Sequence, residues 1–173
     1  EDMKKDPPPA GMNEDEQQAF WGFVNFYIHQ VNLLRYLLNE SYKPVFGDRA
    51  GRLLVGESES GRTCTLEMAP YKTGKAWQES ALIAFEHGYL DLQIPAPMAI
   101  NRPGSVELFT DHPEHPEQAG RYSPMLPWEH AMLAQARNFL KAVRGEAKPP
   151  CDHLEALKDL ELALEYFQIV RES

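Results

Sequence analysis

The chain has 173 residues, 43% of them hydrophobic, and a formal net charge of -9 at pH 7. This length and composition fit a globular chain with its own core, as one domain or one domain with an arm. The acidic charge disfavours nucleic acid and an anionic membrane surface as partners, because both would repel the chain.

Cysteine usage bears on the compartment of the protein. The sequence has two cysteines, Cys64 and Cys151, and two isolated cysteines do not make a disulfide framework. We therefore expect a reducing compartment and a cytoplasmic location. No apolar run approaches the roughly 20 residues that a helix needs to span a bilayer.

The first part of the chain is predicted to be an arm followed by a helix. Residues 1–12 hold three consecutive prolines, which favour an extended arm and exclude a helix. A helix is predicted to begin near Asn13, which forms a capping-box pattern with Glu16. Apolar residues then recur at spacings of three and four, so we expect a core-facing helix that ends around Glu40.

Residues 42–111 change to short β-rich runs that alternate with turn residues. This pattern predicts a mostly antiparallel meander of about five or six strands. Its clearest hairpin turns at residues 86–88. The predicted strands are residues 43–46, 52–57, 63–69, 78–85, 89–94 and 105–110.

Two helices are predicted to close the chain after a polar loop. The first should begin near Pro127 or Trp128 and end at a glycine cap, Gly145, and the second should begin at Asp152. Strands followed by helices favour an α+β fold, with helices packed on one face of an open antiparallel sheet. We expect residues 13–173 to form this single domain, with the other sheet face available for a homo-oligomer.

Three stretches carry a resemblance to a known family. Residues 24–38 hold His29 within an apolar helical pattern, residues 77–92 hold the predicted hairpin, and residues 138–173 hold the closing helix pair. In this order they resemble the C-terminal domain of the glucose–fructose oxidoreductase / inositol dehydrogenase family. The resemblance implies the substrate-binding and oligomerisation half of an NAD- or NADP-dependent oxidoreductase that acts on a sugar, cyclitol or similar polyol.

In that family the nicotinamide cofactor is bound by a separate domain with a Gly-x-Gly-x-x-Gly turn. This sequence has no two glycines separated by one residue, and it lacks the family's Glu-Lys-Pro segment. We therefore expect a nucleotide-binding domain to precede Glu1 in a longer protein, or to have been lost. The chain alone is expected to bind no cofactor and to be inactive.

The resemblance also implies candidate site residues. His29 stands where the family has a catalytic His that transfers a proton at the substrate hydroxyl, and an ordinary His pKa of about 6.5 suits that role. Asn25 and Asn32 stand where the family has Asp. Because an amide cannot act as a base, Asn25 is expected to orient the substrate or His29. Asn32, Lys72 and Arg102 are further predicted substrate contacts, although Lys72 and Arg102 also fit a plain solvated surface.

Two alternatives stay open. The chain can instead be a non-catalytic, stand-alone α+β module that dimerises and binds a small ligand, and the replacement of the family's Asp by Asn25 favours this. The other alternative is a metal-dependent enzyme, because His112 and His115 lie among carboxylates. Prolines prevent a helix that would align these two histidines, and a solvated loop is the simpler expectation.

Residues 56–63 nearly spell a phosphate-binding loop. Arg62 stands where that loop needs Lys, and a strand-like segment follows it instead of a helix. Without a helix N-terminus the anion site is not built. We predict a hairpin turn here.

Overall fold

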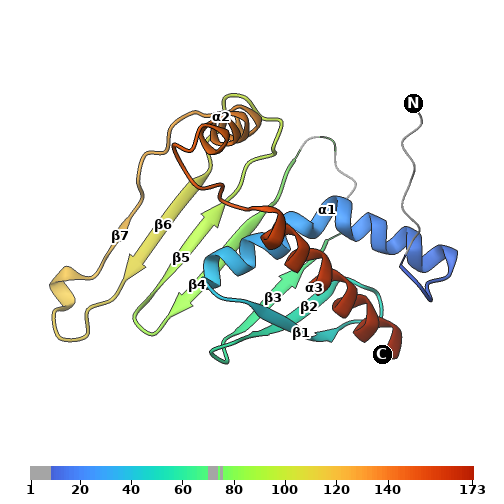
Figure 1. Cartoon of the computed structure of the whole chain (residues 1–173). Helices are drawn as coiled ribbons and strands as arrows, with labels where there is room; N and C mark the ends of the chain where they lie inside the picture. The colour runs from blue at the N-terminus through green and yellow to red at the C-terminus, as the bar shows by residue number, and fades with distance from the viewer. Residues whose placement is uncertain (1–8, 70–73, 75) are drawn as a thin grey trace. The chain divides into compact units, whose positions relative to one another are not determined.

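A computed structural model describes residues 9–69, 74 and 76–173 (Figure 1). These residues form three α-helices and seven strands, and every strand pair is antiparallel. The predicted α+β class with antiparallel strands is confirmed. The strands divide into two sheets, ordered β1-β2-β3 and β4-β5-β6-β7, because β3 and β4 do not pair.

The backbone contacts divide the chain into two compact units, residues 1–71 with 151–173 and residues 72–150. The first unit contains α1, α3 and the three-stranded sheet, and the second contains the four-stranded sheet and α2. Nothing in this division tests the domain boundary at residue 13, which stays a prediction. Most of the expected arm, residues 1–8, lies outside the described residues.

Helix α1, Glu14–Leu38, begins at the predicted capping box. The backbone N–H of Glu16 donates to Asn13 Oδ1 at 3.0 Å, and the backbone N–H of Asn13 donates to Glu16 Oε2 at 2.8 Å. Both groups would otherwise lack a partner at the helix start, so the pair stabilises this end. The helix ends at Asn39, which takes the left-handed conformation with φ 57°.

The core lies in the first unit, between one face of its sheet and the two helices. The strands are β1 (Tyr42–Gly47), β2 (Leu53–Ser58) and β3 (Thr63–Glu67), and α3 spans His153–Glu172. Buried and exposed residues alternate along the strands, so one face carries the core and the other faces solvent. The buried hydrophobic residues are Phe20, Phe23, Val31, Tyr42, Leu54, Cys64, Leu66, Met68, Leu162, Ala163 and Tyr166.

The second unit contains β4 (Ser80–Phe85), β5 (Gly88–Gln93), β6 (Ser105–Thr110) and β7 (Gly120–Tyr122). The hairpin between β4 and β5 turns where the sequence predicts it. A short 3-10 helix, Pro116–Gln118, precedes β7. The sequence analysis missed β7, because a three-residue strand inside a proline-rich loop has too few residues to show a period.

Helix α2, Ala131–Val143, begins later than predicted. The expected start at Pro127 or Trp128 was wrong, because a proline suits a first helical turn without specifying one. The predicted end is confirmed, since Gly145 takes φ 72° just after the helix.

The four-stranded sheet has one predominantly apolar face. Side chains of directly paired antiparallel residues share a face. The pairing therefore places together Ala81, Ile83, Phe85, Leu90, Leu92, Val106, Leu108 and Tyr122. None of the described residues between 74 and 150 is buried, so these side chains are left partly or fully exposed.

Candidate functional site

His29 and Asn25 lie one helical turn apart on α1, and both are exposed. The core face of this helix carries Phe23 and Val31, which are buried. The spacing of four residues places the imidazole and the amide as neighbours on the outward side. The sequence prediction that these two residues act together is thus compatible with their placement.

Neither the His29 nor the Asn25 side chain has a hydrogen bond or ion pair with another described residue. The imidazole can therefore use either ring nitrogen toward a ligand. A neutral imidazole accepts a proton on one nitrogen and donates one from the other, and an amide both donates and accepts hydrogen bonds. The pair can hold a hydroxyl group and exchange a proton with it.

Asn32 points toward α3 and holds the two helices together. Its Nδ2 donates to Asp159 Oδ2 at 2.9 Å and lies 3.6 Å from Cys151 Sγ. This amide is therefore engaged in an interhelical contact, while its role in binding substrate stays a prediction. Burial is the largest cause that raises the pKa of the Cys151 thiol, so a reactive thiolate is disfavoured there.

Arg35 is the centre of a polar cluster that the sequence analysis did not find. Its Nη1 lies 2.9 Å from Asp159 Oδ1, its Nε lies 3.1 Å from Glu155 Oε2, and its Nη2 donates to the backbone oxygen of Glu155 at 2.8 Å. Burial raises the pKa of Asp159, although the Asn32 amide and the Arg35 charge oppose that shift. The signal in the sequence was a charged residue on the apolar side of each helix. Because buried charges are usually paired, two such residues indicate an ion pair between the helices.

The other two predicted substrate contacts are Lys72 and Arg102. Lys72 lies outside the described residues. Arg102 is exposed in the loop between β5 and β6 of the second unit, whereas His29 belongs to the first. Their roles stay predictions.

The loop with His112 and His115 was the candidate metal site. His115 Nδ1 lies 3.4 Å from Glu117 Oε1, and both side chains are exposed. Within the described part of the chain, no three His, Cys, Asp or Glu side chains are grouped so that they could hold a metal ion.

The predicted hairpin turn lies within residues 56–63, where it joins the end of β2 to the start of β3. The carboxylate of Glu40 accepts the Ser60 backbone N–H at 3.1 Å and lies 2.6 Å from Arg62 Nη1. Arg62 therefore pairs with a carboxylate at the base of the turn.

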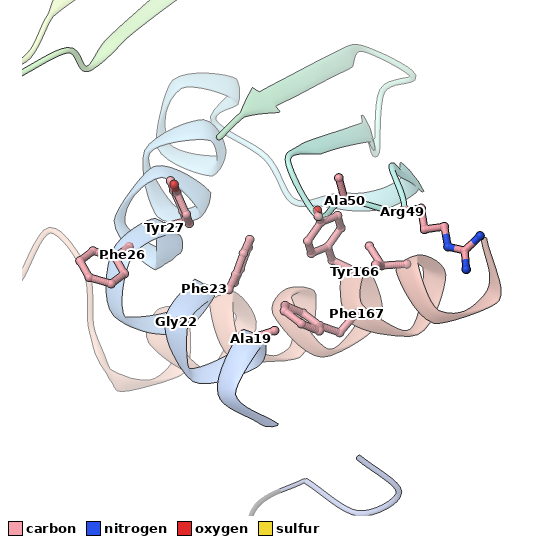
Figure 2. A pocket seen from close by; sticks show the side chains of 11 residues that line it. Ala19, Gly22, Phe23, Phe26, Tyr27, Arg49, Ala50, Tyr166 and Phe167 are labelled. Carbon is pink, nitrogen blue, oxygen red and sulfur yellow. The ribbon is translucent and has the colours of Figure 1, made fainter. Parts of the chain in front are cut away.

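A pocket of about 370 Å³ opens beside α1 in the first unit (Figure 2). It lies between α1, the turn that joins β1 to β2, and α3. Phe23, Phe26, Tyr27 and Phe167 contribute aromatic side chains, and Arg49 contributes a cation. The sequence analysis missed this pocket, because its walls come from three segments far apart in the chain.

No described helix has the length and apolar character needed to cross a membrane.

No family model and no curated protein matches the chain, whereas its fold is similar to those of solved structures, two of which are candidate oxidoreductases. The first is a candidate NADPH-dependent oxidoreductase from Desulfitobacterium hafniense, with a TM-score of 0.68 and 13% identity over 87% of this chain and 46% of that chain. The second is a candidate oxidoreductase from Thermotoga maritima, with a TM-score of 0.61 and 14% identity over 83% of this chain and 43% of that chain. The chain thus spans less than half the length of either protein, and the likeness concerns the fold.

Proposed function

We propose that this chain is the substrate-binding and oligomerisation part of an NAD- or NADP-dependent oxidoreductase that acts on a sugar, cyclitol or similar polyol. The observation that carries the proposal is the exposed pair of His29 and Asn25, adjacent on α1, whose side chains have no hydrogen bond or ion pair with described residues. The likeness of the fold to two candidate oxidoreductases supports it.

His29 is the proton-transfer residue in this proposal. Its imidazole takes the proton of the substrate hydroxyl as the alcohol is oxidised and returns it in the reverse direction. Asn25 orients that hydroxyl, because its amide can donate and accept a hydrogen bond but cannot act as a base. A general acid–base group of this kind contributes about 10²–10⁴-fold to the rate.

No two glycines of this sequence are separated by one residue, so it lacks the Gly-x-Gly-x-x-Gly turn of the dinucleotide-binding fold. We assign the nicotinamide, which accepts or returns the hydride when bound, to a separate nucleotide-binding domain. Phe26 and Tyr36, each 72% exposed, flank His29 on the outward side of α1. Exposed aromatic side chains of this kind are enriched at interfaces, which supports a second domain covering this face.

The reducing compartment is part of the proposal. Cys64 and Cys151 are both free thiols, which supports a location in the cytoplasm, where thiols stay reduced.

The test uses the full natural polypeptide with a panel of polyols, sugars and cyclitols, and follows reduction of NAD and NADP by absorbance. We expect turnover with at least one alcohol, and a loss of about 10²-fold or more in kcat for His29→Asn. The matched control is His87→Asn, since His87 is also exposed but lies in the second unit. Unchanged turnover in His29→Asn would remove the imidazole from the mechanism.

The second candidate is a non-catalytic module that dimerises through the four-stranded sheet and binds a small ligand. The apolar face of that sheet and the absence of buried residues among those described in the second unit favour it. Asn25 stands where the family that the sequence resembles has an Asp, and the loss of that carboxylate also favours this second candidate. The full natural polypeptide distinguishes the candidates, because a module without a nucleotide-binding domain turns over no alcohol.

A further inference from the structure

Four residues of α1 surround one point on the outward side of the helix, and we call them the α1 cradle. They are Gly22, Asn25, Phe26 and His29. Their spacing of three, four and seven residues makes them neighbours on a helix surface. With 3.6 residues per turn, Asn25 and His29 lie to one side of Gly22 around the helix axis, and Phe26 lies to the other. The cradle therefore has a polar side and an aromatic side, with a glycine between them.

The ring on the aromatic side is available to a ligand. Phe26 is 72% exposed, and it has no ring contact with another residue that the structure describes. Figure 2 shows its side chain pointing away from Phe23, which is buried in the core. A ligand that covers the Phe26 ring would remove apolar surface from water, which favours binding.

The glycine leaves space between the two sides of the cradle. A Cβ atom built on Gly22 meets no atom within 4 Å, so no neighbouring side chain fills the place where its own would be. Glycine is unfavourable in a helix interior, but here it lets a ligand approach the backbone of α1 closely. A ligand can therefore lie over Gly22, between the polar pair and the aromatic ring.

A ring-shaped polyol has surfaces that match both sides of the cradle. In a chair-form pyranose or cyclitol with equatorial hydroxyls, the hydroxyls surround the rim and C–H groups cover the two faces. The hydroxyls can exchange hydrogen bonds with Asn25 and His29, and a C–H face can pack on the electron-rich face of Phe26. An open-chain polyol has no lasting apolar face, and it loses more torsional freedom when it binds.

We propose that Phe26 makes this site select a ring-shaped polyol over its open-chain counterpart. A face of the ligand packs on Phe26 above Gly22, while one hydroxyl on its rim contacts His29 and Asn25. This inference rests on the proposed function, because it takes the hydroxyl at His29 as the one that is oxidised. It adds a specificity-determining residue and the glycine that makes room for the ring.

The kinetic test compares anhydroglucitol, which is a pyranose ring, with glucitol, which has the same carbon skeleton in an open chain. With the full natural polypeptide and NAD or NADP, we expect kcat/KM to be higher for anhydroglucitol. Phe26→Ala should lower this kcat/KM by about tenfold, mainly through KM, and change that for glucitol by less than about twofold. Phe139→Ala is the matched control and should change neither value, because Phe139 is 68% exposed but lies on α2 in the second unit.

Binding is measured separately, on the same polypeptide without nicotinamide, by saturation-transfer NMR. Irradiation of the aromatic protons of the protein should transfer saturation to the C–H groups of anhydroglucitol. The transfer should be lost in Phe26→Ala and retained in Phe139→Ala. Gly22→Leu should also lose it, because the added side chain occupies the place of the ligand, while circular dichroism should show that α1 is retained.

The two measurements separate this inference from the proposed function. Saturation transfer that depends on Phe26, in a polypeptide that oxidises no alcohol, supports the binding of the ring and contradicts the oxidoreductase. Turnover of alcohols with the same ring preference in Phe26→Ala as in the unmodified protein overturns this inference and leaves the oxidoreductase standing. The inference is also overturned if anhydroglucitol receives no saturation, or if Gly22→Leu binds it normally.

Discussion

The guanidinium of Arg35 on α1 lies 2.9 Å from the carboxylate of Asp159 on α3, with side chains only 9% and 4% exposed. The second oxygen of Asp159 accepts the Asn32 amide at 2.9 Å. Removing two charges from water costs free energy that their attraction offsets only when the geometry is good and other hydrogen bonds complete it. These contacts join α1 to α3. Replacing both Arg35 and Asp159 should therefore cost less stability than replacing only one of them, because a single replacement leaves a buried charge without its partner.

Replacing one member of this pair should destabilise the protein strongly. Arg35→Leu leaves the Asp159 carboxylate buried without its cation, and we expect the free energy of unfolding to fall by about 3–5 kcal/mol. Urea denaturation followed by circular dichroism measures this change. The double variant Arg35→Leu with Asp159→Leu should recover most of the loss.

The control for that series is an exposed pair. Arg137 Nη1 lies 2.8 Å from Glu129 Oε1, with side chains 59% and 41% exposed. Arg137→Leu should therefore change the free energy of unfolding by less than about 1 kcal/mol. A double variant at Arg35 and Asp159 that is as unstable as Arg35→Leu contradicts the argument.

Asp152, the N-cap of α3, should make stability depend on pH. Its Oδ1 accepts the backbone N–H groups of Glu155 and Leu154 at 3.0 and 2.9 Å, and these bonds, that of Glu155 first, lower the pKa of Asp152. Because the pKa of Asp152 is lower in the folded protein, its carboxylate is protonated at a higher pH in the unfolded chain than in the folded one. The stabilisation is therefore complete above an unfolded pKa of about 3.9 and is lost as the pH falls through the folded value.

Asp152→Asn keeps a cap side chain but has no titrating group. We expect the variant to be less stable than the unmodified chain at about pH 6, with the difference in thermal midpoint shrinking toward about pH 2. Because the pKa of Asp159 is raised, its contribution to stability changes with pH in the opposite direction. Asp159 is present in both proteins, so this contribution cancels in the difference between their thermal midpoints. Midpoints that stay equally far apart at every pH contradict this assignment.

Two glycines should respond oppositely to alanine. A Cβ atom on Gly56 would lie 2.6 Å from Tyr42 Cδ2 and 2.9 Å from Cys64 Sγ, whereas one on Gly22 meets nothing within 4 Å. Gly56→Ala should lower the free energy of unfolding by about 1–3 kcal/mol, because the buried ring must shift. Gly22→Ala in α1 should raise it by up to about 1 kcal/mol. Urea denaturation tests both, and equal changes of one sign are incompatible with this packing.

The four-stranded sheet should associate with a second copy through its apolar face. Phe85 belongs to that face and is 60% exposed, and Leu82, on the opposite face of β4, is 70% exposed. Phe85→Glu should shift sedimentation from dimer to monomer, because it places a charge in the interface, whereas Leu82→Glu should leave the dimer intact. Both residues are already exposed, so neither change needs to disturb folding. A monomeric unmodified chain refutes this prediction.

Local features were predictable from the sequence because they depend on residues a few positions apart. The capping box of Asn13 and Glu16, the N-cap at Asp152 and the glycine at the end of α2 occur where expected. The strands β1 to β6 and the hairpin at residues 86–88 follow from alternating patterns and turn residues. His29 was expected within the apolar pattern of this helix, whereas its side chain is exposed on α1.

Only the tertiary structure decided the contacts between distant segments. The separation of the strands into two sheets depends on which strands pair, and short alternating runs do not specify their partners. Asn32 and Asp159 are 127 positions apart, and the pocket at Arg49 is formed by three such distant segments. The spacing of apolar residues predicts which face of a helix or strand a side chain occupies. Tertiary packing decides which residue that side chain contacts, because each buried charge or ring needs a complementary neighbour.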